Sequence, residues 1–134
     1  MTHLLDTNIC IYVINKQPRT VVERIRRHAP GDIAISALTV AELTYGVEKS
    51  HYSDRNRIAL MEFLFPFTIL DFDTSAAHDY GRIRHSLGAA GTPIGPMDLL
   101  LSAQARSRNL VFVTNNAREF RRVQGLKTEN WARP

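Results

Sequence analysis

The chain has 134 residues, of which 44% are hydrophobic and 22% are charged, and its formal net charge is +4. This length supports one domain, residues 1–134, and the single cysteine, Cys10, excludes a disulfide framework within the chain. No apolar run approaches the length of a membrane span, and the N-terminus lacks a signal-peptide pattern. We therefore expect a cytoplasmic domain with no membrane partner.

Positive charge is concentrated in two segments, residues 19–28 and residues 118–127. Clustered Arg and Lys side chains are typical of proteins that bind an anionic partner such as nucleic acid. Two solvated helix faces explain the same pattern. The charge alone therefore does not identify a partner.

Apolar periodicity and turn residues predict strands that alternate with helices. The predicted strands are short apolar runs, at residues 2–5, 33–35, 67–70 and 110–113, and the tail before Trp131 is a candidate edge strand. The predicted helices cover residues 8–15, 19–28, 37–49, 54–65, 74–88 and 96–105, and a short last helix begins at Ala117 and stops at Gly125. Ser36, and Thr74 or Ser75, are the predicted caps of two of these helices. Pro96 fits the first position of another.

This alternation predicts an α/β fold with a central parallel sheet of four or five strands and helices on both faces. In such sheets, ligands bind outside the carboxyl ends of the strands, where the strand order reverses. Functional side chains are therefore expected just after the predicted strands.

Asp6 follows the first predicted strand and precedes the first helix. Two interpretations fit that position, an N-cap of the helix or the first member of an active site. Asp98 has a similar ambiguity, because an acid in the first turn of a helix also complements the helix dipole. Glu119 comes after the strand at 110–113 and the polar turn that follows it.

Glu42 interrupts a helix that its apolar residues predict to be largely buried. A carboxylate in such a place is costly unless it is paired, binds a metal or lies at a cleft. A partner such as Lys49 or an Arg, or a side of the helix that faces water, explains Glu42 equally well.

These four acids lie at places that can converge on one crevice of a doubly wound sheet. Without a cation, clustered carboxylates repel one another and their pKa values rise. Mg²⁺ or Mn²⁺ would convert them into hard oxygen ligands. An acidic pit inside a basic chain favours metal-dependent attack on a phosphodiester, in which bound metal activates water and stabilises the leaving oxygen.

Four segments resemble the motifs of PIN-domain nucleases, in that family's order and spacing. They are Leu4-Leu5-Asp6-Thr7-Asn8, Ala41-Glu42-Leu43, Gly95-Pro96-Met97-Asp98 and Val113-Thr114-Asn115-Asn116-Ala117-Arg118-Glu119-Phe120. The tail from Arg122 to Trp131 also resembles the VapC toxins of bacterial toxin–antitoxin pairs. The resemblance implies a PIN-like fold and a Mg²⁺-dependent endoribonuclease, with Mn²⁺ as a possible substitute. It also implies a cognate antitoxin that holds the enzyme inactive, a homodimer and a higher toxin–antitoxin assembly.

The resemblance assigns roles to individual residues. Asp6, Glu42 and Asp98 fall on the family's metal-binding acids, and all four acids are expected to be catalytic. Glu119 falls where many members have Asp, so its extra methylene leaves either direct metal contact or a water-mediated role open.

Three polar residues, Thr7, Thr114 and Asn116, match the positions that hold the acids in place in this family. The Thr-Asn-Asn and Arg-Glu-Phe ending resembles the subgroup that cuts initiator tRNA in its anticodon loop. Initiator tRNA is therefore the expected RNA substrate.

Two other classes of function are compatible with parts of the pattern. A non-catalytic nucleic-acid-binding or regulatory module with a degenerate metal site would keep the basic residues but show no turnover. A phosphotransferase fits poorly. A receiver domain needs a Lys where the nearest basic residues are Arg108 and Arg118, and a haloacid-dehalogenase-like enzyme needs a second Asp where the chain has Asn8.

The antitoxin contact is harder to place from sequence. Tyr12, Val21, Val22 and Ile25, flanked by Arg residues, could form a groove for an antitoxin peptide or could belong to the core. An Arg of the antitoxin inserted among the carboxylates would block the acidic pit.

Overall fold

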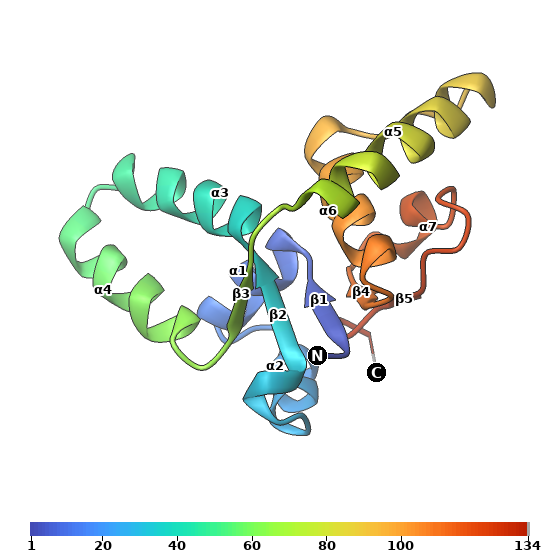
Figure 1. Ribbon diagram of the computed structural model, residues 1–134. Coiled ribbons are helices and arrows are strands. Elements are labelled where there is room, and N and C mark those ends of the chain that lie inside the picture. Colours follow the sequence, from blue (N-terminus) through green and yellow to red (C-terminus); the bar gives the residue numbers. More distant parts are fainter. Residues whose placement is uncertain (134) are drawn as a thin grey trace.

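Five parallel strands form one sheet in the computed structural model, which describes residues 1–133 (Figure 1). The strands are β1 (His3–Leu5), β2 (Ile33–Ser36), β3 (Thr68–Leu70), β4 (Val111–Val113) and β5 (Thr128–Glu129). Their order across the sheet is β3-β2-β1-β4-β5. The predicted parallel sheet is confirmed, and the tail does supply an edge strand.

Seven α-helices, counted over residues 1–133, connect and cover the strands. They are α1 (Thr7–Ile14), α2 (Arg19–Arg26), α3 (Ala37–Glu48), α4 (Ser53–Leu64), α5 (Thr74–Ala89), α6 (Pro96–Ser107) and α7 (Ala117–Phe120), with a 3-10 turn at Pro30–Asp32. In this part of the chain no helix has the length and apolar character needed to cross a membrane.

The sheet has a hydrophobic core on each face. Successive residues of a strand point to opposite faces, so Leu4 and Phe112 pack in one core while Leu5 and Val113 pack in the other. Buried residues of α5 and α6 cover the first core, and buried residues of α1 to α4 cover the second. Helices therefore lie on both faces, as the sequence predicts.

The strand order reverses between β1 and β4. From β1 the chain runs outward to β2 and β3, and then returns to place β4 on the other side of β1. The register pairs Leu5 with Val113, and the Asp6 amide donates to the Val113 carbonyl at 2.8 Å. Asp6 and Thr114 therefore follow the ends of neighbouring strands, at the place where α/β sheets bind ligands.

Helix α3 is less buried than its apolar residues predict. Only Thr39 and Leu43 are buried, Tyr45 is 67% exposed, and Glu42 also lies on the exposed side. The helix packs by one face against β2, α1 and α4, and residues such as Glu42 and Tyr45 on its other side are exposed. The prediction of a largely buried helix around Glu42 is wrong.

The predicted ends of the helices are mostly close to the observed ones. Ser36 caps α3 by accepting from the Leu38 amide, and Pro96 occupies the first turn of α6 as expected. The cap of α5 is neither Thr74 nor Ser75. Asp73 caps it, because the Asp73 carboxylate accepts a hydrogen bond from the Ala76 amide at 2.9 Å.

A largely buried ion pair joins α5 to α6. Asp79, 8% exposed, accepts two hydrogen bonds from the Arg106 guanidinium at 2.8 and 2.6 Å. Arg106 also donates to the Gln124 carbonyl at 2.8 Å, which ties the C-terminal segment to α6. Removal of either partner would leave a charge in a place that water reaches poorly.

We therefore expect Arg106→Met to lower the free energy of unfolding by about 2–4 kcal/mol, because Asp79 would keep a poorly solvated charge. Urea unfolding followed by circular dichroism measures this change. Arg82→Met is the matched control. The Arg82 guanidinium faces the same carboxylate, but at 3.9 Å and with 70% of its side chain exposed, so its ion pair is long and solvated. A loss for Arg106→Met no larger than that for Arg82→Met would contradict the assignment.

Candidate active site

Asp6 connects α1 to β4 through its two carboxylate oxygens. Oδ1 accepts from the Thr7 amide at 2.7 Å, which makes Asp6 the N-cap of α1. Oδ2 accepts from the Thr114 hydroxyl at 2.8 Å. The residue is only 6% exposed, and burial raises its pKa against the opposing effect of these two hydrogen bonds. Asp6 can therefore be both the N-cap of α1 and a member of an active site, the two interpretations that its position in the sequence allows.

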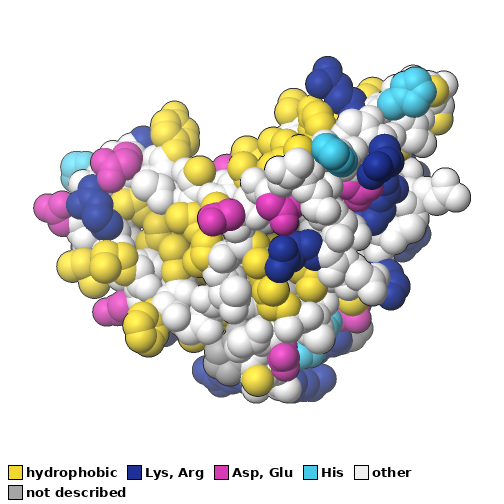
Figure 2. Space-filling model, in the orientation of Figure 1, with side chains coloured by type: hydrophobic (Ala, Val, Ile, Leu, Met, Phe, Trp, Pro, Cys, Tyr) yellow, Lys and Arg dark blue, Asp and Glu magenta, His cyan; other side chains and the backbone are white. Residues whose placement is uncertain are grey.

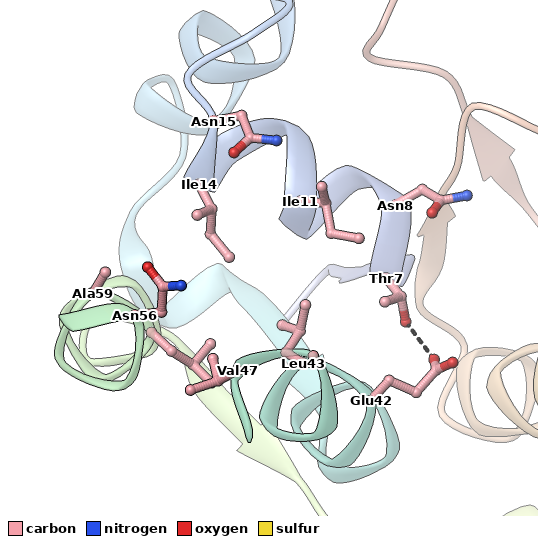
Figure 3. Close-up of a pocket in the computed structure, with 12 residues that line it drawn as sticks. Thr7, Asn8, Ile11, Ile14, Asn15, Glu42, Leu43, Val47, Asn56 and Ala59 are labelled. Carbon is pink, nitrogen blue, oxygen red and sulfur yellow. Dashed lines mark hydrogen bonds between the residues drawn. The ribbon is translucent and has the colours of Figure 1, made fainter. Parts of the chain in front are cut away.

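Glu42 reaches the same place from α3. Its Oε1 accepts a hydrogen bond from the Thr7 hydroxyl at 2.9 Å (Figure 3). That hydroxyl also lies 3.0 Å from the Thr39 hydroxyl. Thr7 therefore joins the start of α1 to α3. The partner of Glu42 is this threonine, and the alternative partner Lys49 lies instead over the ring of Tyr45 at 5.0 Å.

Glu119 is linked to Asp6 through two polar residues. The Asn116 side-chain amide donates to Glu119 Oε2, and the Asn116 backbone amide donates to the Thr114 hydroxyl at 3.0 Å. Thr114 in turn donates to Asp6. The turn after β4 thus holds two acids with one short series of hydrogen bonds.

Asp98 enters from the first turn of α6 and has no comparable support. Within residues 1–133 no hydrogen bond or ion pair to its carboxylate is present. Burial, and after it the charges of Asp6, Glu119 and Glu42, raise the pKa of Asp98 to about 6. All four predicted acids therefore lie close enough to repel one another.

These four acids form no ion pair with a Lys, Arg or His side chain in the part of the chain that the structure describes. Neutral hydroxyl and amide donors hold three of them instead. The acids are thus kept in place with their negative charge available to a ligand. In Figure 2 acidic side chains lie near the centre of the visible face.

The donor set fits a hydrated divalent cation. Carboxylates are the ligands that Mg²⁺ and Mn²⁺ prefer, and Mg²⁺ is usually held by one or two of them while it keeps several waters. Among the described residues no group of three or more Asp, Glu, His or Cys side chains is arranged to hold a metal ion. The site therefore fits an ion with few direct protein ligands and not a closed protein cage.

A groove begins beside these acids and runs between α1, α3 and α4. Its volume is about 550 Å³. Figure 3 shows Ile11 and Ile14 on one wall facing Leu43 and Val47 on the other. Thr7 and Glu42 line the end of the groove nearest the acids. An apolar segment in this groove would therefore end at the acidic site.

The sequence does not predict the supporting role of three residues at the site, Thr39, Asn115 and Tyr12. Thr39 supports Thr7, and its position three residues before Glu42, on the same helix face, is a signal that could have identified it. Asn115 donates to the Tyr12 hydroxyl at 2.7 Å and ties the turn after β4 to α1. Nothing in the sequence pairs those two residues, because they lie on segments far apart in the chain.

Comparison with known proteins identifies the family. The PIN domain model matches residues 3–126. The chain belongs to the PIN-domain family. Within that family it is 46% identical to a Shigella flexneri protein named tRNA(fMet)-specific endonuclease VapC, over 96% of this chain and 97% of the relative. It is 45% identical to Ribonuclease VapC2 of Haemophilus influenzae, over 98% of each chain.

Solved structures support the same assignment of this PIN domain. The chain superposes with a TM-score of 0.93 on a chain from the crystal structure of DNA-bound VapBC of Salmonella typhimurium. The two are 42% identical, and the match covers 98% of each. The four motifs therefore lie in a PIN domain of the VapC type.

We expect Asp98→Asn to raise the melting temperature at pH 7 by about 2–5 °C when divalent ions are chelated. The fold raises the pKa of Asp98 from 3.8 to about 6, so ionisation of Asp98 costs stability above pH 6 and costs none below pH 4. The gain should therefore shrink as the pH falls from 6 to 4.

Differential scanning calorimetry with EDTA, at several pH values, measures this effect. Glu62→Gln on the exposed side of α4 is the control and should leave the melting temperature unchanged. An Asp98→Asn variant that melts below the wild type at pH 7 would show that the carboxylate stabilises the fold.

Proposed function

We propose that this chain is the toxin of a VapBC-type pair and cleaves RNA as a divalent-metal-dependent endoribonuclease. The observation that carries the proposal is the group of four acids, three of which accept hydrogen bonds from neutral donors and none of which forms an ion pair within residues 1–133. The similarity of this chain to VapC proteins of Shigella and Haemophilus, which are named as nucleases, supports the same activity.

Asp6, Asp98 and Glu42 are the proposed metal-binding acids, and those that do not touch the ion would reach it through its bound waters. Glu119 contributes through its own carboxylate or through a water. Bound Mg²⁺ or Mn²⁺ would supply an activated water and would stabilise the leaving oxygen. Thr7 and Thr114 fix the orientation of the acids by donating hydrogen bonds to Glu42 and Asp6.

Asn116 has the same supporting role for Glu119, to which its side-chain amide donates. The hydrogen bonds of Thr7, Thr114 and Asn116 all come from neutral groups, so they hold the carboxylates without cancelling the charge that attracts a cation. These three residues are therefore proposed as positioning residues.

Initiator tRNA, cut in its anticodon loop, is the proposed substrate. The name of the Shigella relative supports this choice, as does the net charge of +4, which favours binding to a polyanion. The cytoplasm, where tRNA resides, is then the site of action.

One observation favours a second candidate, a nucleic-acid-binding module with a degenerate metal site. No three or more of the acidic side chains in residues 1–133 are arranged to hold one ion together. That module would bind RNA and yet show no turnover with either Mg²⁺ or Mn²⁺. The cleavage experiment below separates the two candidates.

The groove between α1, α3 and α4 is the proposed seat of the antitoxin. Solved relatives are VapBC complexes, and in this chain the groove walls offer Ile11, Ile14, Leu43 and Val47 to an apolar segment. The alternative groove of Tyr12, Val21, Val22 and Ile25 has less support. Val21 is fully buried and Tyr12 and Ile25 pack against the same core, which leaves Val22 to line a hollow there, together with Arg19 and Arg26.

An antitoxin segment in this groove would also reach the acids, since Glu42 lines its end. An Arg placed there would form charge-assisted hydrogen bonds with the carboxylates and occupy the place of a metal ion. We propose that this contact inactivates the toxin, in an assembly built on a homodimer of this chain.

Asp6→Asn and Asp98→Asn should each lower the rate of RNA cleavage on the order of 10²-fold or more, because each removes a charge that holds the metal. The measurement is cleavage of purified initiator tRNA with Mg²⁺, with sequencing of the product ends. EDTA should stop the reaction, and the ends should map to the anticodon loop.

Glu62→Gln is again the control, because this exposed acid of α4 lies outside the four-acid group. Cleavage that continues in EDTA, or at the wild-type rate in both Asn variants, would refute the metal mechanism. Wild-type protein that binds the tRNA and never cuts it would support the second candidate.

Gly46→Leu should weaken binding of the cognate antitoxin at least about tenfold, which corresponds to about 1.4 kcal/mol, because the Leu side chain would occupy space that the antitoxin segment needs. Gly46 lines the groove, and a Cβ added there meets no atom within 4 Å, so the side chain can enter the groove from this position.

Isothermal titration calorimetry with the purified antitoxin measures this change. Gly81→Leu is the matched control, because Gly81 lies on α5, is exposed, and has equal room for a Cβ. Equal affinity of the two variants would place the antitoxin elsewhere.

A further inference from the structure

A second, smaller cavity lies between α5, α6 and the loop that joins them. Its volume is about 290 Å³. Its lining residues come from α5, from the loop and from the first turn of α6, and they are Tyr80, Arg84, Leu87, Gly88, Pro93, Ile94, Pro96 and Leu99. No acidic side chain is among them. The functions proposed above make no use of this cavity.

The walls of this cavity combine an aromatic ring, a cation and an apolar floor. The Arg84 guanidinium donates to the Tyr80 hydroxyl at 3.1 Å and lies 6.0 Å from the centre of the Tyr80 ring. Within residues 1–133 Arg84 forms no ion pair with a carboxylate. The floor is made by buried side chains, including Ile94 and Leu99. Such a combination suits a flat, polarisable ring.

The size of the cavity suits one nucleobase. A water molecule takes about 30 Å³ of liquid, so the cavity of about 290 Å³ is equivalent to roughly ten waters. A planar base fits within this volume, because each of its covalently bonded ring atoms takes up less space than a water molecule.

The cavity and the acidic group share the first turn of α6. Pro96 and Leu99 line the cavity, whereas Asp98, which lies between them in the sequence, projects from another face of this helix, and a helix with its side chains is about 10–12 Å across. On the loop side, Arg122 donates to the Pro93 carbonyl at 3.4 Å, which places another cation at that wall. A base in the cavity would therefore belong to a nucleotide close to the phosphodiester at the acids.

We propose that the Tyr80–Arg84 cavity binds one unstacked nucleobase of the RNA, near the bond that is cut. This inference rests on the proposed function, since it takes RNA as the ligand. Base stacking on Tyr80 and the guanidinium of Arg84 then adds affinity for a particular position of a single-stranded loop.

The test uses a synthetic anticodon stem-loop of initiator tRNA in which each loop nucleotide in turn is abasic. Binding is measured by fluorescence anisotropy with the full chain carrying Asp6→Asn, which keeps the RNA intact. One abasic position should raise Kd about tenfold, as expected for one lost stacking contact. In a Tyr80→Leu background the same abasic position should change Kd less than about twofold, because the ring is already absent.

Three further variants sharpen the result. Tyr80→Phe keeps the ring, so the abasic position should still raise Kd about tenfold, a rise termed the abasic penalty. Arg84→Met should reduce the penalty, and this variant tests the site even if Tyr80→Leu fails to fold. Tyr52→Leu is the matched control, because Tyr52 lies under Arg55 at 4.6 Å in a similar pair but lines none of the cavities described above. It should leave the penalty unchanged.

The base site is overturned if no abasic position raises Kd, or if the penalty is the same with and without the Tyr80 ring. A Tyr80→Leu change that alters only the oligomeric state in sedimentation would identify the cavity as a contact between copies and would also overturn it. Wild-type protein that fails to cut RNA, while the penalty depends on Tyr80, would refute the proposed catalysis and leave the base site in place.

Discussion

The Asp6 carboxylate is the interaction on which the rest of the site depends. One oxygen begins α1 and the other accepts from Thr114 at the end of β4, so the two neighbouring strands and the first helix meet at one residue. Thr7 extends this junction to α3, and Asn116 extends it to α7. Displacement of Asp6 would therefore disturb the support of Glu42 and Glu119 as well.

The chain holds three of its four acids with neutral donors. This arrangement forgoes the stabilisation of an ion pair, but it keeps the negative charge that attracts a cation. A salt bridge to Arg would stabilise each carboxylate, yet it would also cancel the charge that draws a cation. The chain does contain such a bridge, between Asp79 and Arg106, on the far part of α5 and α6 where only packing is at stake. The contrast between the two groups shows that charge is neutralised in the helix pair and left free at the strand ends.

The sequence predicts the secondary-structure elements well, and it singles out four acids that the fold does bring together, because apolar runs and the polar residues that follow them are local patterns. Apolar runs mark the strands, and the residues that follow them include Asp6 and Glu119. Strand order and helix orientation depend on contacts between distant segments. Periodicity shows that α3 has many apolar residues, but it does not show which face packs, so Glu42 was expected in a buried helix and lies on the open side. The pairing of Thr7 with Thr39 and the cavity beside Tyr80 were hidden for the same reason.

The residues that form the groove are translated earlier than the residues that complete the acidic site. Every residue that lines the groove lies between Thr7 and Leu60, whereas the four-acid group needs residues up to Glu119. The Thr114–Asp6 hydrogen bond spans 108 residues. Domains emerge from the ribosome N-terminus first. All groove residues are therefore translated before Asp98, and a partner that recognises the groove can meet the chain while its acidic site is still incomplete.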